Sequence, residues 1–250
     1  MIRFETLTAG YGGDERLHGI SCAIPQGRFT ALIGPNGCGK STLLKCAAGV
    51  MKPTDGAIFL DERRYSDFDR RGLARRVAYM PQSRHAPEMT VFQLAACGRY
   101  PHQRWGSGLT AADREIIRAA LARTGADRFA QRSVSSLSGG ERQRAYLAMM
   151  LAQQTDVLLL DEPATYLDLG GQFELMDLLV QLRSEGKTVV AVLHDLTLAL
   201  ECADHVLLMQ EGRLVQQGAP EEILQSGRIG AVFGVHAQCV GGRYVFSRKL

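Results

Sequence analysis

The sequence predicts an α/β protein whose sheet is mainly parallel and whose core is interrupted by a helical insertion. Short runs rich in β-branched residues alternate with helical patterns, which is typical of parallel strands joined by helices. Several runs are apolar throughout, as strands covered on both faces are. Between residues 82 and 152, helical patterns follow one another without a convincing strand. This stretch therefore predicts an inserted helical subdomain.

The expected elements follow from these patterns in chain order. Strands are expected at residues 2–7, 29–33, 57–60, 77–80, 157–160, 188–193 and 205–209. Helices are expected at residues 40–48, 111–124, 139–153, 171–184, 220–224 and 229–233, before a hairpin that turns at Gly241-Gly242. Ser138 and Glu141 have the spacing of a capping box at a helix start. We expect one domain, with a core of residues 1–82 and 153–250 and a subdomain of residues 83–152.

Composition excludes several classes of protein. The 250 residues are 46% hydrophobic and 22% charged, and the net charge of +3 is too small to indicate nucleic-acid binding. The N-terminus lacks a signal-peptide pattern, and no run of about eighteen apolar residues predicts a membrane span. Six cysteines without a C-x-x-C pair favour neither a zinc site nor a disulfide framework, and a reduced cytosol is the simplest setting.

A glycine-rich loop follows the expected strand at residues 29–33 and precedes a helix. It reads G-x-x-x-x-G-K-S, and this strand–loop–helix context is the one that cradles phosphates with backbone N–H groups. We expect Lys40 to hold the β- and γ-phosphates, Ser41 a Mg²⁺ ion and Thr42 a further phosphate oxygen. The thiol of Cys38, beside Lys40, is in a setting that can lower its pKa. The remaining loop residues of the predicted site are Gly34, Pro35, Asn36, Gly37 and Gly39.

Further polar residues stand at the ends of other expected strands. Asp161 and Glu162 end the run at residues 157–160, where Asp161 suits a Mg²⁺ ligand and Glu162 a group that orients or deprotonates a water. His194 follows the next strand, and ligands of open α/β sheets gather at such strand ends. Gln82, after residues 77–80, is placed to reach the metal or the attacking water. Tyr11 offers an aromatic face for adenine stacking.

The segment Leu-Ser-Gly-Gly-Glu-Arg-Gln at residues 137–143 narrows the nucleotide-binding proteins that fit this sequence to one class of ATPase. Together with the features above, and in this order, it resembles the ATP-binding cassette (ABC) ATPases over the whole chain. The resemblance identifies the phosphate loop as Walker A, residues 137–143 as the signature motif and residues 157–162 as Walker B. It also assigns an adenine-stacking position, a Q-loop, a D-loop and a switch histidine to Tyr11, Gln82, Asp168 and His194 respectively.

This resemblance implies a P-loop NTPase fold, with a RecA-like core, an antiparallel β edge and an inserted helical subdomain. It also implies that two such domains pack head to tail, so that ATP bound to one is sealed by Ser138 and Gly140 of the other. An identical chain is the simplest second subunit. The signature residues assigned to nucleotide binding are Ser138, Gly139, Gly140 and Gln143, together with Asp168 of the D-loop.

A finer resemblance is to the importer ATPases for iron–siderophore complexes, haem and cobalamin. It rests on Gly-Arg-Tyr-Pro-His at residues 98–102, Ala-Thr-Tyr-Leu-Asp at 164–168 and Val-Phe-Gly-Val at 232–235. One departure is Gly171 before Gln172, where the family usually has His-Gln. The resemblance implies an ATPase on the cytoplasmic face of the cell membrane, with ATP and Mg²⁺ as cofactors, a separate membrane permease and, indirectly, a substrate-binding protein.

Other functions stay open at this stage. An ATPase of a haem, cobalamin or zinc/manganese importer is the second hypothesis, because the ATPase never contacts the cargo; the segment at residues 98–102 favours iron chelates by resemblance. A soluble ABC ATPase acting on ribosomes or DNA is a further alternative. Members of that kind usually carry two cassettes or long coiled-coil insertions, and neither occurs in this chain. Ferric siderophore import is the leading hypothesis.

Overall fold

The computed structural model describes residues 1–82, 86–104, 106 and 108–248. Its centre is a six-stranded sheet in the order β10-β9-β3-β8-β7-β6. The strands from β9 to β6 run parallel, and β10 joins β9 antiparallel at one edge. These strands are β3 (Phe29–Ile33), β6 (Val77–Met80), β7 (Val157–Leu160), β8 (Thr188–Val192), β9 (His205–Gln210) and β10 (Arg213–Gly218).

Burial explains why the central strands read as continuous apolar runs. Every residue of β3, β7 and β8 is buried, because helices or a second sheet cover both faces. The face toward α6 (Leu169–Ser184) and α7 (Leu196–Cys202) forms one hydrophobic cluster. The other face packs against α1 (Lys40–Ala47), which lies between the two sheets.

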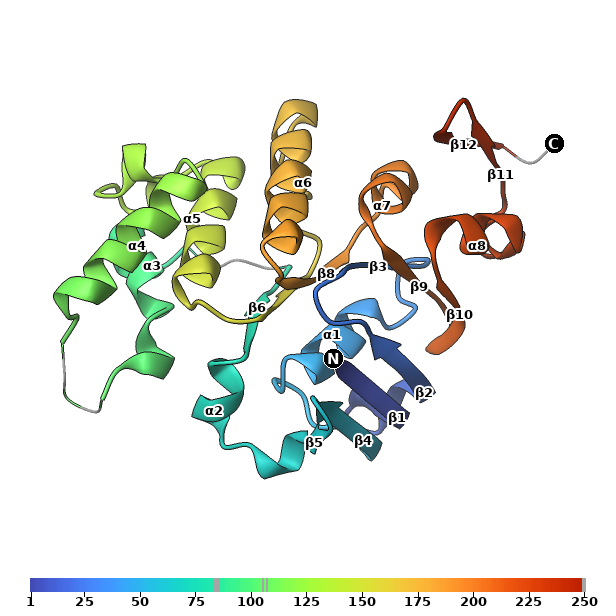
Figure 1. The fold of residues 1–250 in the computed structure, drawn as a ribbon, viewed down its shortest axis with the longest axis horizontal. Helices are drawn as coiled ribbons and strands as arrows, with labels where there is room; N and C mark the ends of the chain where they lie inside the picture. The colour runs from blue at the N-terminus through green and yellow to red at the C-terminus, as the bar shows by residue number, and fades with distance from the viewer. Residues whose placement is uncertain (83–85, 105, 107, 249–250) are drawn as a thin grey trace.

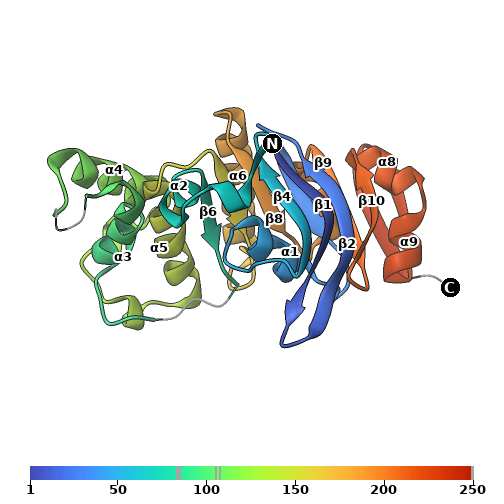
Figure 2. The same ribbon diagram turned by 90° about the horizontal axis from the view of Figure 1, so that it is seen from below.

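The second sheet is antiparallel, in the order β2-β1-β4-β5. Figure 2 shows its strands lying beside α1 on the side of the molecule away from the helical end. Its members are β1 (Ile2–Tyr11), β2 (Asp14–Ile24), β4 (Asp55–Leu60) and β5 (Arg63–Arg64). The short helix α2 (Arg70–Ala74) then leads into β6.

Helices gather at the opposite end of the molecule, as Figure 1 shows. They are α3 (Val91–Cys97), α4 (Ala111–Arg123) and α5 (Gly139–Ala152). Among residues 86–104, 106 and 108–152, the only β pairing is a single bridge between Thr90 and Ser133. Ser138 caps α5 in a capping box with Glu141, which confirms the prediction made from their spacing. The predicted helical subdomain begins at residue 83, and residues 83–85 lie outside the described residues. Its limits, 83–152, therefore stay a prediction.

The C-terminal part adds α8 (Pro220–Gln225), α9 (Arg228–Phe233) and a hairpin of β11 (Val235–Val240) and β12 (Arg243–Arg248). The hairpin at Gly241-Gly242 is confirmed. Within the described part of the chain, no helix is both long enough and apolar enough to cross a bilayer.

All seven predicted strands are present, and the predicted α/β class with an antiparallel edge is confirmed. Strands β2, β5 and β10 and helices α2, α3 and α7 were not predicted from the sequence. The reason for missing β2 lies in its pattern. It begins with three exposed residues, and Gly19, with a φ of 65°, interrupts the alternation of buried and exposed side chains.

Candidate functional site

The glycine-rich loop joins β3 to α1 and holds the amino group of Lys40 inside it. Lys40 is only 5% exposed, and its Nζ donates hydrogen bonds to the carbonyl oxygens of Gly34 (2.7 Å) and Pro35 (2.9 Å). Gly39 has a φ of 100°, and a Cβ there would lie 2.8 Å from the carbonyl oxygen of Arg16. The backbone therefore requires glycine at this position. The loop ends at the first turn of α1, whose free N–H groups favour an anion.

Asp161 lies at the end of β7 and faces this loop from the neighbouring part of the sheet. Ser41 Oγ donates a hydrogen bond to Asp161 Oδ1 (2.9 Å), and the hydroxyl of Tyr79 donates to Oδ2 (3.3 Å). Asp161 is 1% exposed, and burial raises the pKa of this carboxyl above its ordinary value, although the hydrogen bond from Ser41 opposes the shift. A serine hydroxyl and a buried carboxylate that already touch are oxygen donors of the kind that Mg²⁺ prefers. The residues present therefore fit that ion.

Glu162, the next residue, is held between two side chains from other strand ends. Gln82 Nε2 donates a hydrogen bond to Glu162 Oε2 (2.7 Å), and His194 Nε2 lies 2.7 Å from Oε1. The backbone of Glu162 has a φ of 49°, which is uncommon for a residue with a side chain. Such strain is typical of residues whose side chain must point in a defined direction at a site.

These groups open into one cavity of about 510 Å³. Tyr11 stands at its rim, about half exposed, and its hydroxyl accepts a hydrogen bond from Lys45 Nζ (3.1 Å). Of the residues predicted for the site, the cavity is lined by Tyr11, Asn36, Gly37, Gly39, Lys40, Ser41, Thr42, Gln82, Glu162 and His194. The structure thus brings the loop, the carboxylates and the two polar residues that follow other strands to one place.

The signature and D-loop residues lie elsewhere on the same chain. Ser138, Gly139, Gly140 and Asp168 do not line this cavity. Ser138 and Gly139 are exposed at the start of α5, and Asp168 is exposed at the start of α6, where its carboxylate accepts a hydrogen bond from the N–H of Gly171 (2.8 Å). A Cβ on Gly139 would lie 3.0 Å from Tyr166 Cβ, so the two segments are in contact. They form a second surface without a phosphate loop.

The structure corrects two expectations. Gln143 was expected to contact nucleotide, but it is fully buried within α5, and both polar atoms of its side chain lack a hydrogen-bond partner among the described residues. It presents no atom to a ligand at the exposed start of the helix. Cys38 was expected to have a lowered pKa. Instead burial raises the pKa of the thiol, because the side chain is 4% exposed and the charge of Lys40 only partly compensates.

Two residues at the site were missed from the sequence. Arg16, on β2, lines the cavity near Tyr11, and its side chain is paired with Asp14 (2.6 Å). Its strand was not predicted, so no position could be assigned to it. Tyr79 was read only as part of the strand at residues 77–80. Tyr79 is the second-last residue of β6 and pairs with Leu159 near the end of β7. This position close to the strand ends was the signal that could have indicated a role at the site.

Comparison with known proteins gives consistent matches along the chain. Residues 17–165 match the family model described as ABC transporter. The petrobactin import ATP-binding protein FpuD of Bacillus anthracis is 46% identical over 95% of this chain and 88% of that protein. The ferric enterobactin transport ATP-binding protein FepC of Escherichia coli (strain K12) is 43% identical over 96% of this chain and 89% of that protein.

A solved structure extends the comparison to three dimensions. The dimeric structure of MJ0796, a bacterial ABC transporter cassette, superposes with a TM-score of 0.80 at 27% identity, covering 88% of this chain and 99% of that one. The similarity therefore extends to the fold over most of the chain.

Proposed function

The chain belongs to the ABC transporter family as an ATP-binding ATPase subunit, and from this premise we propose that it energises import of a ferric siderophore through a separate membrane permease. The observation that carries the enzymatic part is the contact of Glu162 with both Gln82 and His194 beside the phosphate loop. The cargo rests on the relatives, whose names include petrobactin and ferric enterobactin.

ATP is the substrate, and its phosphates belong in the glycine-rich loop. The Nζ of Lys40 already points into the loop, where it accompanies the N–H groups at the start of α1. A bound phosphate would replace the carbonyl oxygens of Gly34 and Pro35 as the acceptors of that lysine. Adenine would stack on the half-exposed ring of Tyr11, with Arg16 beside it.

Ser41 and Asp161 are the residues that would hold Mg²⁺, with the amide oxygen of Gln82 available from the next strand. When bound, the ion would neutralise charge on the phosphate oxygens. The burial of Asp161 keeps its carboxylate in a fixed position, and Tyr79 occupies the second oxygen of that carboxylate.

We assign to Glu162 the role of orienting or deprotonating the attacking water. Its carboxylate is oriented from both sides, by the amide of Gln82 and the imidazole of His194, so a water placed between it and the γ-phosphate would meet a fixed acceptor. Since Gln82 leads into the helical region and His194 follows β8, movement of either element would change the position of Glu162. This provides a physical link between domain movement and hydrolysis.

Two copies are needed to complete the site. Ser138, Gly140 and Asp168 lie on a surface apart from the cavity, so they are free to close over ATP bound to a second copy. The Ser138 cap leaves the start of α5 directed outward, where its N–H groups and dipole suit a γ-phosphate. We propose an identical chain as that copy, which the dimer of the similar cassette supports.

Residues 83–152 form the proposed docking region for the permease, which would place the chain peripherally on the cytoplasmic face of the membrane. In the segment 98–102, Arg99 is buried and donates to Asp113 Oδ1 (2.8 Å) and the carbonyl of Ala152 (2.8 Å), whereas Tyr100 is 63% exposed. The buried arginine fixes the turn, and the exposed tyrosine is available to a second protein. A substrate-binding protein would act outside the membrane, without contact with this chain.

Other cargoes are the runner-up proposal. A relative of Halobacterium salinarum named as a cobalamin import ATP-binding protein is 40% identical over 91% of this chain. Haem or zinc/manganese importers remain alternatives on the same mechanism, because the site described here contacts only nucleotide.

The test is uptake in cells whose only copy of this chain carries Glu162→Gln. We expect loss of labelled ferric siderophore uptake with unchanged uptake of haem, cobalamin and zinc. A matched control is Glu62→Gln, at an exposed position between β4 and β5 and outside the proposed docking region, which should transport normally. Loss of a different cargo alone would replace the siderophore, and normal transport of all cargoes with the variant stably expressed would refute the importer role.

A further inference from the structure

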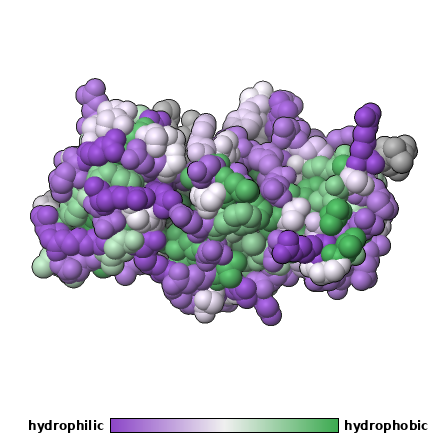
Figure 3. All heavy atoms as spheres, turned by 90° about the horizontal axis from the view of Figure 1, so that it is seen from above, coloured by the Kyte–Doolittle hydropathy of each residue, from purple (hydrophilic) through white to green (hydrophobic). Residues whose placement is uncertain are grey.

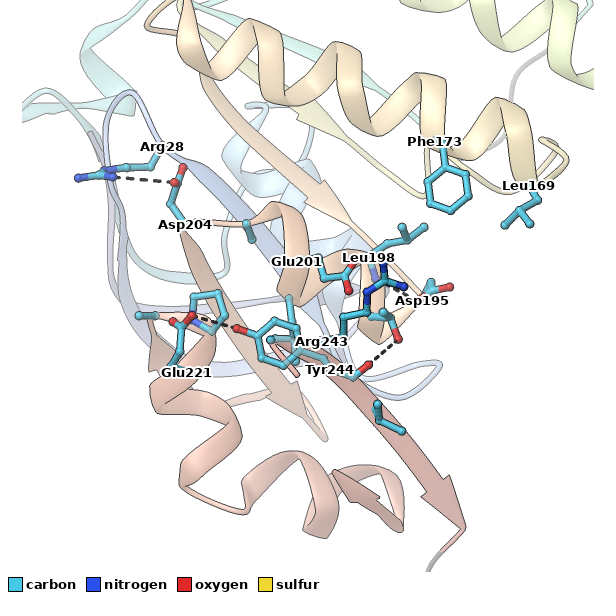
Figure 4. Close-up of a pocket in the computed structure, with 17 residues that line it drawn as sticks. Arg28, Leu169, Phe173, Asp195, Leu198, Glu201, Asp204, Glu221, Arg243 and Tyr244 are labelled. Atoms are coloured by element: carbon cyan, nitrogen blue, oxygen red, sulfur yellow. Dashed lines mark hydrogen bonds and ion pairs between the residues drawn. The ribbon is translucent and has the colours of Figure 1, made fainter. Parts of the chain in front are cut away.

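An open groove lies on the side of the molecule that carries the C-terminal hairpin, and it plays no part in the site described above. Its volume is about 1030 Å³, and its walls come from the start of α6, from α7 and from β12. Figure 4 shows Leu169 and Phe173 projecting from α6 on one side, and Arg243 and Tyr244 from β12 on the other. Figure 3 shows apolar surface over the middle of the molecule and on toward its C-terminal end.

Three apolar side chains of this groove are left exposed by the described part of the chain. Leu169 is 68% exposed, Phe173 is 51% exposed and Val245 is 41% exposed. Leu169 and Phe173 are four residues apart on α6, so they share one face of the helix. Contiguous exposed apolar surface of this kind marks interaction sites more often than free surface.

The hairpin that forms the far wall packs on the described part of the chain through one face, with Tyr244 buried and Val235, Ala237 and Phe246 partly buried. Its two strands pair only with each other, and Tyr244 is its one buried side chain among residues 235–248. The hydroxyl of Tyr244 donates a hydrogen bond to Glu221 Oε1 (3.0 Å), which anchors one end. The opposite face of the hairpin, which includes Val245, is exposed, so contact with a second surface would bury further apolar area there.

The position of the groove identifies what covers it. Leu169 directly follows Asp168, and the exposed ring of Tyr166 lies against Gly139 of the signature segment. The apolar face of α6 therefore continues the surface that is proposed to meet a second copy at the D-loop. A twofold interface uses the same surface of both copies, so a face of α6 that begins at the D-loop would have the corresponding face of the other copy opposite it.

The charges in the groove have the pattern that a self-pairing surface needs. Glu201, on α7, and Arg243, on β12, are both exposed, and no ion pair of either occurs among the described residues. Under twofold symmetry an acidic residue of one copy meets a basic residue of the other, and the reverse contact forms at the same time.

We propose that this groove is a second contact area between two copies of this chain, in which Phe173 and the β11–β12 hairpin of each copy pack together and Arg243 pairs with Glu201 of the other copy. This inference rests on the proposed pairing of two copies and extends it beyond the nucleotide. The contact lies outside the ATP site, so it strengthens association without changing how one copy binds ATP.

The test measures the dimer dissociation constant by sedimentation equilibrium, with the full chain carrying Glu162→Gln and saturating ATP. We expect Arg243→Glu or Glu201→Arg alone to weaken dimerisation at least about tenfold, because like charges then face each other. An equimolar mixture of these two variants should recover the parent affinity, since every contact between copies again joins opposite charges. Phe173→Ser should also weaken the dimer, whereas Val50→Ser, at a 66% exposed position on another surface, should not.

Each other outcome overturns the inference. Dissociation constants within twofold of the parent for all variants would show that the groove is free in the dimer. If one chain carrying both Arg243→Glu and Glu201→Arg recovers the parent affinity but the mixture of single variants does not, the Arg243–Glu201 pair forms within one chain. Failure of the parent to dimerise with ATP would refute the proposed pairing itself, whereas an ATP-driven dimer unaffected by these changes refutes only this contact.

Discussion

The hydrogen bond between Tyr79 and Asp161 leads to a prediction about Mg²⁺. Tyr79→Phe removes one hydroxyl that donates to Asp161 Oδ2 at 3.3 Å and leaves the ring in place. Hydrogen bonds to charged groups contribute roughly 1.5–3 kcal/mol, and the long distance favours the lower end of that range. Because about 1.4 kcal/mol corresponds to a factor of ten, we expect about a tenfold rise in the Mg²⁺ concentration for half-maximal ATPase activity.

The assay separates this effect from a general loss of structure. Binding of Mn²⁺ in the presence of ATP, followed by its electron paramagnetic resonance signal, should weaken by the same factor, whereas ATP binding without metal should not change. The matched control is Tyr65→Phe, which removes a hydroxyl that donates to the carbonyl of Ala47 (2.7 Å). Unchanged Mn²⁺ affinity in Tyr79→Phe, or an equal loss in the control, would refute the reasoning that Tyr79 positions the carboxylate.

Three further predictions follow from the same structure. Glu162→Gln should lower steady-state ATPase activity by about 10²–10⁴-fold with ATP affinity retained, and loss of ATP binding in an equilibrium titration would contradict the role assigned to this carboxylate. Gly39→Ala should weaken ATP binding and lower the melting temperature far more than Gly186→Ala. Both glycines have positive φ, but of the two only Gly39 has atoms within 3 Å of the added Cβ. Equal effects of the two substitutions would show that the close contacts at Gly39 do not matter. The hydrogen bonds from Thr110 and Arg99 lower the pKa of Asp113 to about 2, so this carboxylate stabilises the fold above its ordinary pKa and that contribution is lost as the pH falls toward 2. Asp113→Asn should remove this part of the acid dependence in urea unfolding and, at pH 7, leave Arg99 buried without its charge partner at a cost of roughly 3–5 kcal/mol; an unchanged acid profile would show that the pair contributes nothing.

Local features were predictable because their causes lie within a few residues of sequence. The capping box of Ser138 and Glu141 depends on a spacing of three residues, and the structure has both of its hydrogen bonds. The glycine-rich loop depends on a strand, on glycines with positive φ at positions 34, 37 and 39, and on a helix start, all within a short stretch of sequence. The order of the motifs along the chain was likewise sufficient to predict the family and the α/β class.

Interactions between distant segments were decided by the tertiary structure. Ser41 and Asp161 are 120 residues apart, and Gln82 and Glu162 are 80 apart, yet each pair is in hydrogen-bond contact because β3, β7 and β6 lie in one sheet with their carboxyl ends at one edge. Motif matching alone anticipated that these residues act together, but their contacts required the strand order.

The sequence by itself predicted the fold class, the family and the candidate residues of the site, because each motif is a local arrangement of backbone and side chain. Only the tertiary structure decided which of these residues meet, which are buried and which lie on a surface away from the cavity. Burial withdrew Gln143 from the surface and raised the pKa of the Cys38 thiol. Both effects come from the packing of side chains contributed by remote parts of the chain, which no spacing along the sequence encodes.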